Sequence, residues 1–195
     1  MLSILALSRI YGNKVVSSIL KYVIKSLSIN LVLFVGDTVS PQIIYDIYRS
    51  TRTIVMGVPG IYDDVSVIKV LKEINGFLEG QLKNFNKIRI AGIGVSIDSS
   101  INSLVSKTND VDLLVTYYPG RKHNPLRSNG LAKIDELIDK IKPKTIIFGK
   151  GRGKCVFNEH FIYPGEGFKG YFTVLSFSEN LLLEKVKCCD IYSFL

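Results

Sequence analysis

Short apolar segments of strand length alternate with amphipathic helical segments through the first two thirds of the chain. The apolar segment 4–6 precedes a helical pattern that Asn13 can cap and that runs to Leu27 with its apolar side chains on one side. The apolar segment 31–35 precedes a predicted helix over 41–49 with a proline in its first turn. Such alternation predicts a sheet core flanked by helices.

The rest of the chain continues this alternation and then becomes rich in strands. A region of strands that follows alternating strands and helices along the chain predicts an α/β fold with two sheets packed face to face. No linker, repeat or low-complexity segment interrupts the 195 residues, so we expect a single domain over 1–195. The remaining predicted elements are a strand at 53–56, a helix capped by Asp63 or Asp64, a hairpin over 77–93, a helix near 101–107, a strand at 112–116, a helix at 131–141, and strands at 145–148, 155–158, 161–163, 171–177 and 181–187.

Charge and cysteine content narrow the class of protein. The net charge of +8 favours acidic partners such as nucleic acid, and a basic protein without such a partner is an equal alternative. No apolar run approaches the roughly 18–20 residues that cross a bilayer, and residues 1–8 read as a first strand rather than a signal peptide. Cys155, Cys188 and Cys189 give neither a pairing framework nor metal-ligand spacing, so we expect reduced thiols in a cytoplasmic protein. Abundant isoleucine and lysine without tryptophan indicate an AT-rich or heat-adapted, archaeal-like source.

Short polar turns follow five of the predicted strands. Loops at the carboxyl ends of strands converge on the ligand crevice of open α/β sheets, so we expect these turns to form one site. The turns lie at 8–13, 36–38, 59–64, 116–119 and 149–153.

The turns, in this order and at these intervals, resemble the motifs of the calcineurin-like metallophosphoesterase superfamily, particularly its small bacterial and archaeal phosphodiesterase branch. That superfamily carries S-D-x-H-G-N, G-D, G-N-x-D, T-H-x-x-P, G-H-x-H and a closing N-P-G-S. The chain has SRIYGN from Ser8, GD ending at Asp37, PGIYDD, TYYP, GKGR and a closing YPGE that ends at Glu166. The resemblance implies a four-layer αββα sandwich of the metallo-dependent phosphatase type.

The chain departs from these motifs at most metal-ligand positions. Asp37 remains where the resemblance places a bridging aspartate, and Tyr62 takes the usual position of the catalytic histidine. The chain is therefore identified as a degenerate member that lacks most metal ligands. The other vestigial positions carry Arg9 for aspartate, Tyr11 for histidine, Ile61 for asparagine, Tyr117 for histidine, and Lys150 and Arg152 for two histidines.

These replacements argue against a two-metal centre. Such a centre needs about six or seven ligands, and one matched position retains a ligand. Permanent positive charge at Arg9, Lys150 and Arg152 repels a divalent cation, so we expect no metal and no other cofactor. A buried Asp37 then needs a new partner, and the guanidinium of Arg9 is predicted to pair with it.

Several uses of the altered site stay open. The cleft is purely structural if the cations only replace metal charge, or it binds a phosphate, nucleotide or nucleic-acid backbone without metal. A third use is that of metal-free members of the superfamily, which act as assembly subunits, here through the basic helix around Lys21 or the aromatic tail 192–195. We predict a catalytically inactive binding or scaffold module with a protein partner or anionic ligand; the alternative is a weakly active or atypical metal-dependent phosphodiesterase or phosphatase. The candidate anion-binding residues are Arg9, Lys150, Arg152, Arg121, Lys122, Tyr11 and Tyr62, with His123 on the rim.

Overall fold

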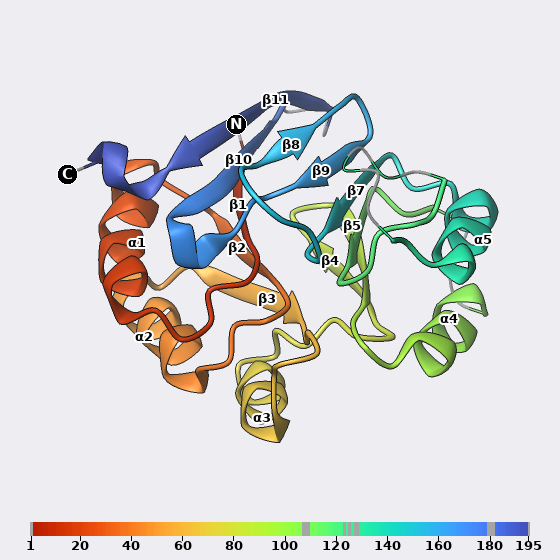
Figure 1. Ribbon diagram of the computed structural model, residues 1–195, viewed down its shortest axis with the longest axis horizontal. Coiled ribbons are helices and arrows are strands. Elements are labelled where there is room, and N and C mark those ends of the chain that lie inside the picture. The colour runs from red at the N-terminus through yellow and green to blue at the C-terminus, as the bar shows by residue number, and fades with distance from the viewer. Residues whose placement is uncertain are drawn as a thin grey trace.

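Two sheets pack face to face at the centre of the molecule, and helices cover the outer face of each sheet (Figure 1). This computed structural model describes residues 2–106, 110–122, 124, 126, 129–178 and 182–194. The layers follow the order helix, sheet, sheet, helix, which is the αββα arrangement that the sequence predicts.

The first sheet has five strands in the order β11-β10-β1-β2-β3. β1 (Leu2–Leu7), β2 (Leu31–Val35) and β3 (Ile54–Val58) run parallel to one another. β10 (Tyr171–Phe177) pairs antiparallel with β1, and β11 (Leu183–Asp190) pairs antiparallel with β10 at the edge. The three parallel strands therefore end at the same edge of the sheet.

The second sheet has six strands in the order β4-β5-β6-β7-β9-β8. Its four inner strands run parallel, whereas β4 forms the predicted hairpin with β5 and β8 pairs antiparallel with β9. The parallel arrangement of β7 and β9 brings the carboxyl ends of both strands to one edge. The strands are β4 (Leu82–Phe85), β5 (Ile88–Ile93), β6 (Leu113–Thr116), β7 (Thr145–Phe148), β8 (Val156–Phe157) and β9 (Phe161–Tyr163).

Alternating side chains of the strands divide the core into three layers. Leu5 and Phe34 pack with the helices that cover the first sheet. Ile4 and Leu33, each one residue away, point the other way and pack between the sheets with residues such as Ile147. A third cluster joins the second sheet to its own helices.

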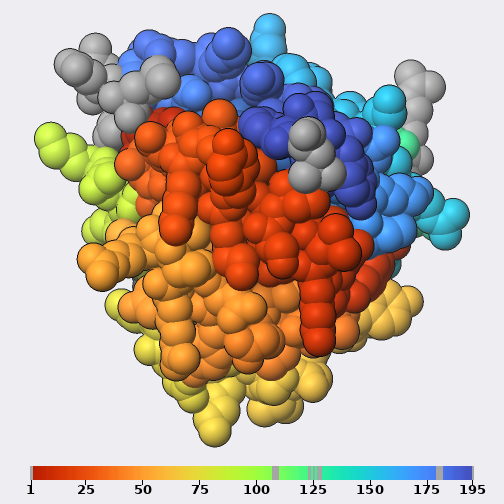
Figure 2. Space-filling model, turned by 90° about the vertical axis from the view of Figure 1, so that its left-hand side faces the viewer, coloured from red at the N-terminus to blue at the C-terminus, as the bar shows by residue number. Residues whose placement is uncertain are grey.

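The helices lie on the two outer faces of the sandwich. Figure 2 shows one of these faces, where α1 and α2 lie beside each other. Among the described residues, none of the helices is long and apolar enough to cross a membrane. The bounds are α1 (Lys14–Ser26), α2 (Pro41–Thr51) and α3 (Val65–Glu73) over the first sheet, α4 (Ile97–Val105) and α5 (Ala132–Ile141) over the second, and the 3₁₀ turns η1 (Gly167–Lys169) and η2 (Ile191–Phe194).

The helix boundaries agree with the sequence in most places. The Asn13 side chain accepts hydrogen bonds from the backbone N–H groups of Val15 and Val16, which confirms the predicted cap of α1. Asp64 rather than Asp63 caps α3. The helix predicted near 101–107 begins earlier, at Ile97, because its first turn is largely polar and carries little apolar periodicity.

The cysteines correct the prediction of reduced thiols. Cys155, which follows the fifth polar turn, forms a disulfide with Cys188 on β11, with 5.7 Å between their Cα atoms. Cys189 is a buried free thiol on the opposite face of β11. The sequence could not reveal this pair because the two cysteines lie 33 residues apart, on segments from different sheets. The disulfide also removes the argument that the cysteines offered for a reducing compartment.

The aromatic tail packs partly on its own domain. The Phe194 ring lies 6.0 Å from that of Phe172, whose side chain is fully buried in the core. Tyr192 stays 47% exposed, and Leu195 lies outside the described residues. Phe194 therefore packs on its own domain, whereas Tyr192 remains exposed.

Candidate functional site

The polar turns meet at one end of the sandwich, as the sequence predicts. The first turn is tied to the second by backbone hydrogen bonds from the N–H groups of Arg9, Tyr11 and Gly12 to the carbonyls of residues 36, 37 and 38, at 3.0–3.1 Å. Arg9, Tyr11 and Asp37 have positive φ angles of 53°, 50° and 53°. Such left-handed conformations are uncommon for residues other than glycine and gather at functional sites. The backbone of the motifs is thus retained although their ligands have changed.

Asp37 lies on the floor of the resulting cleft and is 1% exposed. Its carboxylate accepts hydrogen bonds from the hydroxyl of Tyr117 at 2.9 Å and from the backbone N–H of Tyr62 at 3.2 Å. The hydroxyl of Tyr11 lies 3.5 Å away, at the limit of a hydrogen bond. Three groups of this chain therefore surround the carboxylate that the resemblance assigns to bridging metals.

The two tyrosines keep their protons and act as donors. Burial, together with the charge of Asp37, raises the pKa of Tyr117 far above its ordinary value. Burial also raises the pKa of Tyr11, and the hydrogen bond from Arg9 only partly opposes this effect. Tyr117 is 2% exposed, at the position where the resemblance places a histidine. Neutral phenols of this kind donate well to a carboxylate and are poor ligands for a divalent cation.

Arg9 does not pair with Asp37, contrary to the prediction. Its Nη1 forms an ion pair with Oε1 of Glu166 at 2.9 Å and also donates to the carbonyl of Gly151. Its Nε donates to the hydroxyl of Tyr11 at 2.7 Å. The Tyr11 hydroxyl thus contacts both the guanidinium and Asp37, and a different carboxylate balances the charge of Arg9.

Glu166 is the site residue that the sequence analysis missed. It is 4% exposed and accepts further hydrogen bonds from the backbone N–H of Gly153 at 2.9 Å and from Nζ of Lys169 at 2.7 Å. Burial disfavours its charge, but the hydrogen bonds from Lys169 and Gly153 and the attraction of Arg9 outweigh burial and lower the pKa of Glu166. The sequence did offer one signal for Glu166, the predicted strand at 161–163. Because this strand, β9, runs parallel to β7, the closing YPGE turn lies at the same edge of the second sheet as the turn that follows β7.

Asp63 holds two of the turns together. Its carboxylate accepts backbone hydrogen bonds from Val39 at 2.6 Å and from Gly60 at 2.7 Å. Burial raises the pKa of Asp63, partly opposed by these two hydrogen bonds. Gly60 is required there, because a side chain would place its Cβ 2.3 Å from the backbone nitrogen of Asp37. Asp63 is therefore a positioning group for the turns around Asp37.

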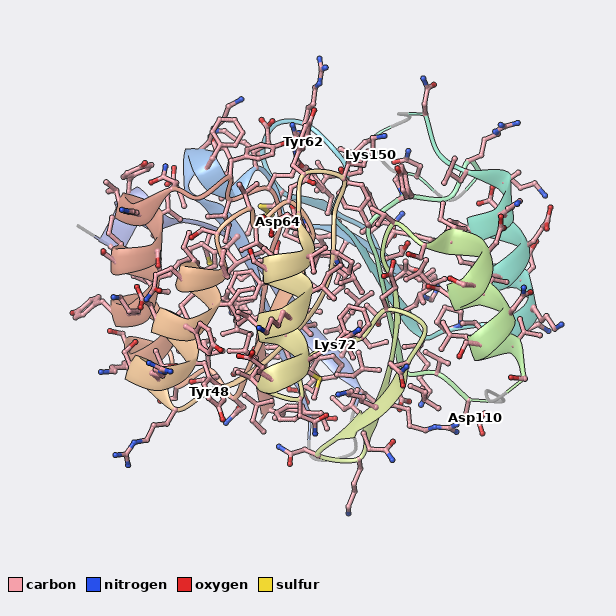
Figure 3. All side chains as sticks on the ribbon, turned by 90° about the horizontal axis from the view of Figure 1, so that it is seen from below. Tyr48, Tyr62, Asp64, Lys72, Asp110 and Lys150 are labelled. Carbon is pink, nitrogen blue, oxygen red and sulfur yellow. A yellow bond between two sulfur atoms is a disulfide. The ribbon has the colours of Figure 1, made fainter. Side chains whose placement is uncertain are left out.

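Lys150 and Arg152 lie at the mouth of the cleft and are exposed. Neither forms an ion pair with a described residue. The Nζ atom of Lys150 lies 4.6 Å from the ring centroid of Tyr118, a cation–π contact that leaves its charge uncompensated. Figure 3 shows Lys150, on the turn after β7 of the second sheet, beside Tyr62, on the turn after β3 of the first sheet.

Not all predicted anion-binding residues come together. The pocket has a volume of about 620 Å³, and neither Arg121 nor Lys122 lines it among the described residues. The backbone N–H groups of Arg121 and Lys122 donate instead to the carboxylate of Asp135 at the start of α5. His123 lies outside the described residues. The lining consists of Arg9, Tyr11, Asp37, Ile61, Tyr62, Tyr117, Leu126, Asn129, Lys150, Gly151 and Arg152.

The donor set does not fit the two-metal centre of the metallophosphoesterases. Asp37 is the carboxylate on the floor, and its oxygens already accept hydrogen bonds from Tyr117 and Tyr62. The remaining vestigial positions carry cations, protonated phenols or Ile61. In the described part of the chain, no group of three or more His, Cys, Asp and Glu side chains is placed to hold a metal ion.

Comparisons with solved structures place the fold. No family model matches the sequence, and no curated protein matches it significantly. The TT1561 protein of Thermus thermophilus has a TM-score of 0.74 at 13% identity, with 97% of this chain and 98% of that chain covered. A novel archaeal phosphodiesterase has a TM-score of 0.62 at 12% identity, covering 96% and 100%. A novel phosphatase of Mycoplasma pneumoniae has a TM-score of 0.60 at 11% identity, covering 96% and 92%. The chain therefore has the two-sheet sandwich fold of the metallophosphoesterases.

Proposed function

We propose that this chain is a catalytically inactive protein of phosphoesterase fold that binds an anionic group in its metal-free cleft, as a binding or scaffold module. The observation that carries the proposal is the separation of charges in the cleft. Arg9 is neutralised by Glu166, whereas Lys150 and Arg152 at the mouth have no ion-pair partner among the described residues.

The floor of the cleft supports the loss of metal-dependent hydrolysis. Two-metal hydrolysis needs cations that activate a water and stabilise the leaving oxygen. Asp37 offers its carboxylate to Tyr117 and to the backbone of Tyr62 instead. The positive charge of Lys150 and Arg152, unpaired within the described part of the chain, lies beside the same pocket and opposes entry of a divalent cation.

The mouth of the cleft supports anion binding. Lys150 and Arg152 flank Gly151, which is buried and packs so closely that an added Cβ would lie 2.5 Å from Leu126 and 2.7 Å from the ring of Tyr163. This packing fixes the turn that presents the two exposed cations at the mouth. Hydrogen bonds from charged donors contribute about 1.5–3 kcal/mol each when the partner is well placed. Lys150 and Arg152 have no ion-pair partner among the described residues, so they gain this hydrogen-bond energy only when an external anion binds.

Titration calorimetry with inorganic phosphate and pyrophosphate tests the proposal. We expect binding by the unmodified chain, and a loss of affinity of about 10-fold or more in the Lys150→Ala/Arg152→Ala double variant. Lys140→Ala, which removes an exposed lysine from α5, is the matched control and should bind as the unmodified chain does. Absence of binding by the unmodified chain would overturn anion binding. Manganese-dependent hydrolysis of an aryl phosphodiester that Asp37→Ala abolishes would favour the enzymatic alternative.

A further inference from the structure

An apolar shelf adjoins the cationic pocket. Tyr11, Val39 and Tyr62 line a shallow depression of about 370 Å³, and both tyrosines also line the pocket that holds Lys150 and Arg152. Tyr62 is 64% exposed and Val39 is 38% exposed. Large apolar side chains left open to water beside a binding pocket mark a place where an apolar ligand group can be buried.

The shelf is held in place by the same contacts that organise the floor. The backbone N–H of Tyr62 donates to Asp37, and the ring of Tyr62 packs edge-on against that of Tyr11 at 5.7 Å. Val39 has a φ of 67°, a costly conformation for a β-branched residue, and Asp63 fixes its N–H at 2.6 Å. The aromatic surface is thus presented by a rigid backbone, which lowers the entropy lost on binding.

We infer that the ligand of this cleft is a mononucleotide, with its phosphate at Lys150 and Arg152 and its base on the shelf formed by Tyr11, Val39 and Tyr62. The inference rests on the proposed function and names its ligand class. A phosphate joined to a flat, weakly polar ring matches both halves of the surface, because cations bind the phosphate and aromatic faces stack on any base.

Size and charge favour a single nucleotide over a nucleic-acid strand. The pocket and the shelf together fall within the range of small-molecule sites. Beyond Tyr62 lies one exposed carboxylate, that of Asp64, which caps α3 (Figure 3). A strand that continued in that direction would bring its next phosphate toward a carboxylate, whereas a mononucleotide ends before it.

Calorimetry with adenosine 5′-monophosphate and ribose 5-phosphate separates the contribution of the base from that of the phosphate. We expect the nucleotide to bind on the order of 5- to 100-fold more tightly than ribose 5-phosphate, as expected for one base stacked on aromatic side chains. Tyr62→Ala should bring the ratio of the two affinities close to one, while Tyr62→Phe should retain it. Tyr22→Ala removes a tyrosine that is also 64% exposed, on α1, and should change neither affinity.

The outcomes distinguish the inference from the proposed function. Equal binding of the two compounds, with loss of both in Lys150→Ala/Arg152→Ala, would overturn the mononucleotide and leave anion binding intact. Absence of binding by either compound and by phosphate would overturn both. A short single-stranded oligonucleotide that binds more tightly than the mononucleotide, with its affinity lost in Tyr62→Ala, would replace the inferred ligand by nucleic acid.

Discussion

Polar groups on the floor of the cleft are buried and bonded to one another, whereas those at its mouth are exposed and lack ion-pair partners within the described residues. On the floor, Asp37 is held by Tyr117, and Arg9 by Glu166. At the mouth, Lys150 and Arg152 remain open to solvent. A buried charge in a cleft without metal requires a partner, because an unpaired buried charge is costly. Asp37 and Arg9 on the floor meet this requirement. The positive charge of Lys150 and Arg152 at the mouth makes no ion pair with the described residues and is therefore available to bind a ligand.

The largest expected effect comes from removing the floor carboxylate that neutralises Arg9. Glu166→Gln breaks a largely buried ion pair and leaves the partly buried guanidinium of Arg9 without a carboxylate, at a cost of about 3 kcal/mol of the free energy of unfolding. Urea unfolding measures the change. Glu184→Gln, at an exposed position on β11, is the control and should be within about 0.5 kcal/mol of the unmodified chain. A Glu166 variant as stable as this control would contradict the assigned role of the ion pair.

A smaller loss is expected from the Tyr117 hydroxyl. Tyr117→Phe leaves the buried carboxylate of Asp37 without its shortest hydrogen bond, at a cost of about 1–3 kcal/mol. A double-mutant cycle with Asp37→Asn isolates the interaction. Additive losses in the cycle would mean that Tyr117 contributes by packing alone.

The pH dependence of stability gives a further view of the floor. The pKa of Glu166 is lower in the folded chain than its ordinary value of 4.5, so its contribution to stability is present above pH 4.5 and is lost as the pH falls through the folded pKa. Thermal unfolding between pH 7 and pH 3 should therefore show a steeper acid decline for the unmodified chain than for Glu166→Gln. Parallel declines would assign acid sensitivity to other carboxylates.

The smallest effect on stability is expected at the mouth. Lys150→Ala and Arg152→Ala remove exposed charges that make no ion pair with the described residues, so each should change the free energy of unfolding by no more than about 0.5 kcal/mol. The same variants should weaken phosphate binding. A loss of stability comparable to that of Tyr117→Phe would show that the mouth is structural, like the floor.

The fold was largely readable from the sequence because its signals are local. Strand 31–35 agrees with β2 to the residue, and Asn13 caps α1 as its position before the apolar pattern indicated. The site was harder, because pairing across the cleft depends on contacts between distant turns. Arg9 and Glu166 are 157 residues apart, and nothing near Arg9 in the sequence distinguishes Glu166 from Asp37 as its partner. The Cys155–Cys188 disulfide could not be predicted for the same reason.

Metal content combined with manganese titration tests the central claim, that side-chain charges have taken the place of inorganic ions in this cleft. We expect the purified protein to carry no stoichiometric metal, and we expect its melting temperature not to change when manganese is added. Two metals per chain, with both lost in Asp37→Ala, would contradict it.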